Sequence, residues 1–198
     1  DWFAEIVLGL NDAIRERMTP LVIGISAPVV VMPNYGDEEA SPAVPLIALL
    51  LRRLGVRVLV HGAIETQGGL LNCSIFREFG VLPAATRSQA GRQLAENGLA
   101  LLPTALFSPG LAAMLSLRNC LGIRTPAHTL ANMLMPVVAT SSSSLHVLHI
   151  APWLKPRLAD ENIVLDAPAL LVATSESSND RWLEGGAHIA FRDGETHP

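Results

Sequence analysis

Residues 28–60 read PVVVMPNYGDEEASPAVPLIALLLRRLGVRVLV and hold the first complete strand–helix–strand unit of the chain. The β-branched run over 28–33 is bounded by prolines, which is typical of a strand buried on both faces. An apolar helix is predicted over 43–54, and Gly55 is a favourable residue to end it. The next strand is predicted over 56–60. Because the helix carries the chain back before this second strand begins, the stretch predicts a parallel pair.

The rest of the chain repeats this alternation. Apolar spacing and terminal glycines predict further helices over 1–18, 72–79, 87–97, 109–121 and 125–135. Strands are predicted over 99–103, 145–149 and 169–174, and the segment 184–198 is predicted to hold a turn and one edge strand. The expected fold class is therefore α/β, with a mostly parallel sheet and helices on both faces.

Composition limits the classes of function. Hydrophobic residues make up 49% of the 198 residues and charged residues 16%, against roughly 25% charged in soluble domains. This apolar content excludes a disordered chain. The apolar stretches 43–51 and 101–117 are interrupted before they reach the roughly 18–20 residues of a membrane span, so we expect no membrane partner. A net charge of −4 argues against a dedicated nucleic-acid binder, although a local basic patch can override the total.

The two cysteines, Cys73 and Cys120, lie far apart and belong to no CxxC or Cys/His metal spacing. With no signal peptide ahead of them, they favour reduced thiols in a cytoplasmic protein and predict no metal site. The chain begins at Asp1 rather than Met, and we interpret it as a piece of a longer protein.

Ligands of a parallel sheet bind beyond the carboxyl ends of the strands, which selects the loops 33–42, 61–70, 103–110 and 174–181. In the first loop, Gly36 and Asp37 precede a helix, where backbone N–H groups and the helix dipole can hold a phosphate. The acidic run 37–39 either holds a cation-bound phosphate there or only stabilises the helix N-terminus.

His61 and Gly62 stand at the end of a predicted strand, shortly before the pair Gly68-Gly69. Glycine pairs permit close approach of the backbone to a ligand. A histidine at a strand end, on the other hand, is often a hydrogen-bonded structural residue, so both interpretations stay open for His61.

Arg124 precedes Thr125-Pro126, a pair that favours the start of a helix, and His128 follows in the first turn. An arginine at such a position is placed to hold a carboxylate or a phosphate. Motifs of other enzyme classes are missing, because the sequence has no G-x-S-x-G elbow, no Walker loop and no G-x-G-x-x-G.

The order of these segments resembles the anthranilate phosphoribosyltransferase superfamily, glycosyltransferase family 3. The residues that carry the resemblance are Pro33-Asn34-Tyr35-Gly36-Asp37, Val60-His61-Gly62-Ala63 and Gly122-Ile123-Arg124-Thr125. They follow the order of the family's G-T-G-G-D, K-H-G-N and G-I-R-T motifs. The YbiB-type branch, with a P-S-Y loop, a V-H-G segment and R-x-x-A-H-T-L, is more similar still, since Asn34-Tyr35 and residues 124–130 match it.

The resemblance covers roughly residues 28–174 and implies a parallel α/β domain over 21–198. Residues 1–20 would then be a helix of the hinge or of the small helical domain that precedes it in the family, and the full-length protein would be a homodimer. The ligand implied is a phosphorylated ribose or another anionic small molecule. The ligand-binding residues carried over are Asn34, Tyr35, Gly36, Asp37, His61, Gly62, Arg124 and His128.

Three departures from the family pattern bear on catalysis. The phosphate loop keeps one glycine, Gly69 stands where a basic residue is expected, and residues 175–180 read SESSND without an adjacent acidic pair. Transfer from a diphosphate requires neutralisation of the leaving group by metal or cations. We therefore expect a degenerate phosphoribosyl-diphosphate site with weak or no transferase activity, and Mg²⁺ only if the protein is a transferase after all.

Three hypotheses remain on this fold, and the fold alone does not choose between them. The first is a phosphoribosyltransferase-type domain in which Arg124 holds an acidic acceptor. The second is a non-catalytic nucleic-acid (DNA) binding protein, as the YbiB-type branch implies, although the acidic run 37–39 opposes phosphate contacts. The third is a retained fold that binds a different small acidic or nucleotide ligand.

Overall fold

The computed structural model describes residues 2–34, 43–63, 70–123, 125–140, 144–150, 169–173 and 188–192. Its helices are α1 (Trp2–Arg17), α2 (Ala43–Arg53), α3 (Leu70–Glu78), α4 (Arg87–Asn97), α5 (Thr104–Phe107), α6 (Pro109–Ser116), α7 (Arg118–Leu121) and α8 (Pro126–Met133). Its strands are β1 (Leu21–Ile23), β2 (Val29–Pro33), β3 (Arg57–Gly62), β4 (Leu99–Pro103), β5 (Val137–Ala139), β6 (Ser144–Ile150), β7 (Ala169–Ala173) and β8 (His188–Arg192).

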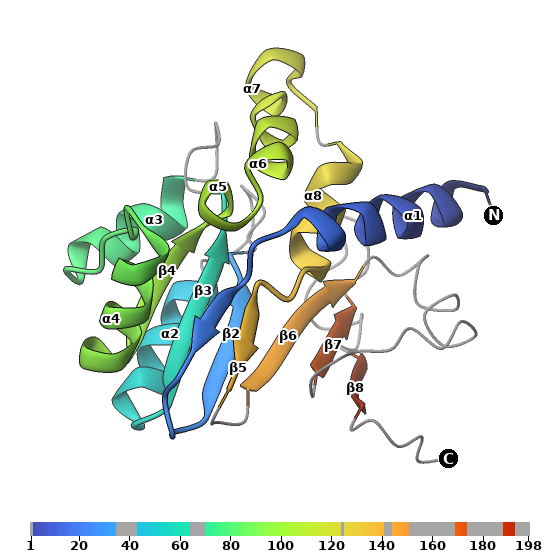
Figure 1. Ribbon diagram of the computed structural model, residues 1–198. Helices are drawn as coiled ribbons and strands as arrows, with labels where there is room; N and C mark the ends of the chain where they lie inside the picture. The colour runs from blue at the N-terminus through green and yellow to red at the C-terminus, as the bar shows by residue number, and fades with distance from the viewer. Residues whose placement is uncertain are drawn as a thin grey trace.

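The main sheet has the strand order β4-β3-β2-β6-β7-β8. All neighbours in it are parallel except β8, which pairs antiparallel with β7. The chain moves outward from β2 to β4 and then places β6 on the other side of β2, so the strand order reverses between β2 and β6 (Figure 1). The prediction of a mostly parallel sheet with an edge strand in 184–198 is confirmed. Ligands of such sheets bind beside a reversal of this kind, at the carboxyl edge.

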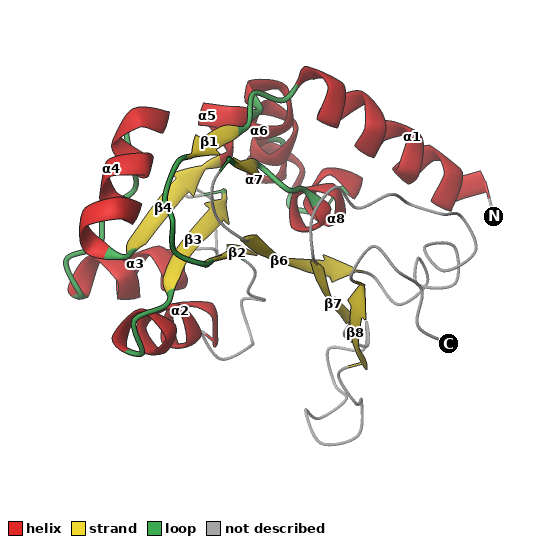
Figure 2. Ribbon diagram, turned by 60° about the horizontal axis from the view of Figure 1, so that its bottom comes forward, coloured by secondary structure: helices red, strands yellow, loops and turns green. Residues whose placement is uncertain are grey.

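Helices cover both faces of the sheet, as predicted (Figure 2). On one face, Met32, Val58 and Val60 pack together with Ala48 of α2 and Phe76 of α3. On the other, buried residues of the strands pack with residues of α4, α5, α6 and α8 and of the β1–β5 pair; they include Val31, Leu59, Leu102, Leu94, Phe107, Leu111, Ala127 and Val137. Successive strand residues point to opposite faces, and the apolar runs of β2, β3 and β4 therefore supply both cores.

Three short elements were not predicted. β1 pairs in parallel with β5 to form a separate two-stranded sheet, and α5 is a single turn after β4. The helix predicted over 109–121 is also interrupted. At Leu117 the backbone N–H bonds to the Met114 carbonyl three residues back, and the tighter turn separates α6 from α7. Within the described helices, none combines the length and the apolar content needed to cross a membrane.

Candidate functional site

The carboxyl ends of β2, β3 and β4 lie side by side. Pro33 is in register with His61, and Gly62 with Pro103. The backbone N–H of Asn34 extends this pairing by donating to the His61 carbonyl. The predicted loops after these three strands therefore start from one edge of the sheet, as the topology requires.

Asn34 lies at this edge, and its side-chain amide bonds to two other elements. Its Nδ2 donates to the Ala63 carbonyl just beyond β3 at 3.2 Å. Its Oδ1 accepts from Nδ2 of Asn72, in the first turn of α3, also at 3.2 Å. A longer contact of 3.8 Å joins Nδ2 to the Cys73 thiol. The asparagine thus connects the ends of β2 and β3 to the start of α3.

Gly62 fits this edge because it has no side chain. Its φ of +151° is in the region that favours glycine, and a Cβ there would lie 2.9 Å from the Asn34 Cβ. That separation is shorter than ordinary contacts allow, and the neighbouring atom is held by the hydrogen bonds of Asn34. The close approach of two chain segments, rather than a ligand contact, is the local reason for this glycine.

His61 points into the core on the face covered by α5, α6 and α8. It is 1% exposed, and its ring packs edge-on against Phe107 of α5 with 5.9 Å between ring centroids. Neither ring nitrogen has a hydrogen-bond partner within the described part of the chain. Burial, and secondarily the neighbouring His146, lowers the pKa of His61 to about 3, so the ring is neutral at physiological pH.

His146 was not among the predicted site residues. It lies on β6, across β2 from His61, and its pKa is lowered by burial to about 4. Its Nε2 is 3.1 Å from the Ser144 hydroxyl. The available signal was the spacing of Ser144 and His146 within the predicted strand, because alternate residues share one face of a strand.

His128 is buried in the first turn of α8, which packs against β6 and β2 at the end of the sheet where the parallel strands finish (Figure 1). Its Nδ1 accepts from the backbone N–H of Thr125 at 3.1 Å. Together with the bond that the Thr125 side chain accepts from the His128 backbone N–H, it forms a capping box at the start of α8.

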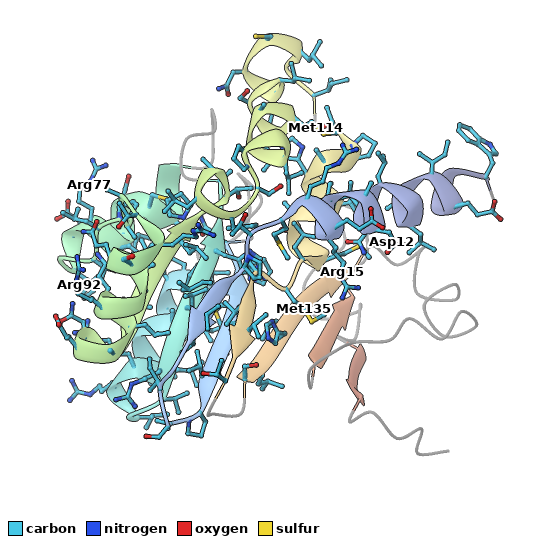
Figure 3. The ribbon with its side chains drawn as sticks, viewed as in Figure 1. Asp12, Arg15, Arg77, Arg92, Met114 and Met135 are labelled. Carbon is cyan, nitrogen blue, oxygen red and sulfur yellow. The ribbon has the colours of Figure 1, made fainter. Side chains whose placement is uncertain are left out.

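The described edge supplies hydrogen-bonding groups but little charge. Asn34, Asn72 and neutral His61 carry none at physiological pH. Arg77 and Arg92 project from the outer sides of α3 and α4, away from α8 (Figure 3). Across the described ranges, no three His, Cys, Asp or Glu side chains gather closely enough to hold a metal ion.

Of the predicted ligand-binding residues, the structure brings Asn34, His61 and Gly62 together and places His128 on the helix above β2 and β6. Tyr35, Gly36, Asp37 and Arg124 lie outside the described residues, as do Gly69 and the segment 174–181. For these positions the sequence-based expectations stay predictions, and we derive no step through Mg²⁺.

The chain is similar in sequence to known proteins, although no family model matches it. The chain is 33% identical over 132 residues to the protein YbiB of Escherichia coli (strain K12), covering 66% of this chain and 41% of YbiB. It is 27% identical over 154 residues to the anthranilate phosphoribosyltransferase of Desulfitobacterium hafniense (strain Y51), covering 76% of this chain and 45% of the enzyme. The chain thus spans less than half the length of these two relatives.

Solved structures share the fold. The anthranilate phosphoribosyltransferase of Thermus thermophilus superposes with a TM-score of 0.57 at 22% identity, over 86% of this chain and 51% of the enzyme. The enzyme of Saccharomyces cerevisiae in complex with PRPP and Mg superposes with a TM-score of 0.60 at 17% identity, over 85% of this chain and 47% of that one. At these identities the similarity establishes the architecture only.

Proposed function

We propose a function from the premise that this chain belongs to the anthranilate phosphoribosyltransferase superfamily, in its YbiB-like branch. The chain binds an anionic ligand of the phosphoribosyl or nucleotide type at the carboxyl edge of its sheet, and it has weak or no transferase activity. Because the chain covers under half the length of YbiB and of the Desulfitobacterium enzyme, the proposal concerns this domain and not a whole enzyme.

The observation that supports the ligand site most directly is that β2 and β3 end side by side, with Pro33 in register with His61, next to the point where the strand order reverses. Helix α8 packs against β2 and β6 at this end of the sheet, and its N-terminus carries the partial positive charge of the helix dipole. The PRPP in the yeast complex makes a phosphorylated ribose the first ligand to test. Arg124, next to the first turn of α8 in the sequence, would supply the cation that the described edge lacks.

Weak or absent transfer is supported by the three departures in the sequence. With one glycine in the segment 33–37 and Gly69 in place of a cation, the chain offers a diphosphate fewer N–H donors and less positive charge. Losing a cation and a carboxylate ligand at roughly 1–3 kcal/mol each weakens binding by roughly 10²–10⁴. Residues 175–180 also lack the adjacent acidic pair that would hold Mg²⁺ between protein and diphosphate.

Isothermal titration calorimetry with phosphoribosyl diphosphate, with and without Mg²⁺, tests both parts of the proposal. We expect binding whose affinity is unchanged by Mg²⁺, with no release of diphosphate when anthranilate is added. Micromolar, Mg²⁺-dependent binding would overturn the degenerate site and restore the transferase. Failure to bind phosphoribosyl diphosphate, ribose 5-phosphate or a mononucleotide would refute the anion site itself.

A second candidate is non-catalytic binding of nucleic acid, which the resemblance to the YbiB-type branch implies. The observation that favours it is the higher identity to YbiB, 33% against 27% for the Desulfitobacterium enzyme. Titration of single-stranded DNA at increasing salt tests it, because each phosphate contact steepens the salt dependence. Binding that weakens by orders of magnitude between low and moderate salt supports this candidate, and binding insensitive to salt contradicts it.

A further inference from the structure

Asn34 forms hydrogen bonds with three other segments of the chain, at the edge of the sheet where the ligand site is proposed. Its backbone N–H bonds to the carbonyl of His61, its Nδ2 to the carbonyl of Ala63, and its Oδ1 to the side chain of Asn72. The partners belong to β3, to the segment after β3 and to α3, at sequence separations of 27 to 38 residues. Both polar ends of the amide are therefore engaged within the protein.

We propose that Asn34 is a positioning residue: it braces β2, β3 and α3 against one another and so fixes the groups that bind the anion. This inference rests on the proposed function. Asn34 keeps its place at the site but acts through its neighbours and not by touching the ligand. A ligand that formed hydrogen bonds with the Asn34 side-chain amide would have to break its bonds to the Ala63 carbonyl and to Asn72. Breaking these bonds at a half-buried position costs free energy.

Packing supports the same role. Gly62 leaves room for the Asn34 Cβ at a separation that no other residue would permit, so the two strand ends approach closely where the brace forms. Beyond β3, the partners Ala63 and Asn72 stand on either side of the Gly68-Gly69 pair in the sequence. Asn34 thereby connects residues 33–37 and 60–63, two of the three segments that carry the family resemblance, to the start of α3.

The labelling rate of the Cys73 thiol reports whether the hydrogen bonds of Asn34 are intact. Its thiol lies 3.8 Å from the Asn34 Nδ2, it is 6% exposed, and burial raises its pKa, against the smaller lowering effects of the Asn34 hydrogen bond and of Arg77. A thiol in this state reacts slowly with disulfide reagents. The second cysteine, Cys120, is exposed on α7 and can be removed by Cys120→Ser to leave one thiol.

The experiment measures the rate of Cys73 labelling and the affinity for phosphoribosyl diphosphate in the Cys120→Ser background. Asn34→Ala should speed the labelling at least fivefold, because the access to the thiol gained on loss of the brace outweighs the rise in thiol pKa that follows loss of the Asn34 hydrogen bond. It should also weaken binding roughly tenfold. Asn34→Asp, which keeps an acceptor for Asn72 but sets an oxygen against the Ala63 carbonyl, should do the same. Asn97→Ala, an exposed asparagine at the end of α4, is the matched control and should change neither.

The effect of the ligand on the rate of Cys73 labelling distinguishes a positioning role of Asn34 from a purely structural one. Saturating ligand should slow Cys73 labelling in the parent protein, and Asn34→Ala should abolish this protection, since coupling between two sites is reciprocal. Should Asn34→Ala fail to fold, Asn72→Ala removes the same hydrogen bond from the other side and must show the same loss of protection.

The outcomes distinguish the inference from the function on which it rests. Unchanged labelling in Asn34→Ala, or faster labelling with parental affinity and intact ligand protection, would overturn the brace while the anion site stands. If the parent protein binds no phosphate ligand, the proposed function fails and the positioning role fails with it, whatever the labelling rates show.

Discussion

Acidification should destabilise this protein through two buried histidines. His61 and His146 lie on the same face of the sheet, each 1% exposed, and their pKa values are lowered to about 3 and about 4. Among the described residues, the short elements that cover this face offer no counter-ion. The segments α5 (TALF), α6 (PGLAAMLS), β1 (LVI) and β5 (VVA) have no titratable side chain, and α8 (PAHTLANM) has His128 alone. The acidic residues of α1 and α4, which also pack on this side, are exposed; they are Glu5, Asp12, Glu16 and Glu96. A protonated ring would therefore be buried without compensation.

The sign of the effect follows from linkage. Well above pH of about 6.5, both rings are neutral in the folded and in the unfolded chain. The two histidines then do not lower the free energy of unfolding. Below that pH the unfolded chain takes up protons that the folded chain refuses, so stability falls until the pH reaches the folded values. At about pH 5 the loss is about 2 kcal/mol per histidine and about 4 kcal/mol for both. Domains of this size are typically stable by about 5–15 kcal/mol, so the loss should be large.

Chemical denaturation at pH 7.5 and 5.0 measures this loss, and a His61→Leu/His146→Leu double variant supplies the reference. Carboxylates elsewhere contribute equally to both proteins and cancel in the comparison. The parent should lose about 4 kcal/mol more than the double variant between the two pH values, and each single variant should fall about halfway. Equal losses in parent and double variant would refute the reasoning and mean that the two rings find proton-accepting partners when the protein is acidified.

Three further changes have expected outcomes. Gly62→Ala should lower the free energy of unfolding by roughly 1–3 kcal/mol because of its positive φ and the 2.9 Å contact. Gly91→Ala, in open space within α4, should instead raise it by about 0.5–1 kcal/mol. Thermal melts in which the Gly62 variant is the more stable of the two would contradict this local geometry. Phe107→Ala should cost about 3–5 kcal/mol in denaturant titrations, since it leaves a cavity beside His61, and a cost below 1 kcal/mol would mean that the site collapses or is open to water. Arg124→Lys should weaken anion binding in calorimetry although the charge is kept, because a lysine cannot form the two-pronged contact; parental affinity would exclude Arg124 from the site.

The main architecture is predictable from the sequence, because the information that specifies it is local. Buried parallel strands such as 28–33 need apolar side chains on both faces, and the helix between them needs an apolar stripe and a terminating glycine. These requirements are met within a few neighbouring residues, so most element boundaries agree with the structure to within one or two residues. The placement of Asn34, His61 and Gly62 at one edge followed as well, since parallel strands bring their carboxyl ends together.

The contacts of these residues, by contrast, depend on how distant segments of the chain pack together. The three-residue strands β1 and β5 carry no periodic signal and exist because partners 116 residues apart meet. In the same way, nothing near Asn34 in the sequence reveals that its amide bonds to Asn72, or that His146 comes close enough to His61 to influence its ionisation. A pattern of residue types specifies which face of an element is buried, but the partner of a polar group on that face depends on how distant segments pack.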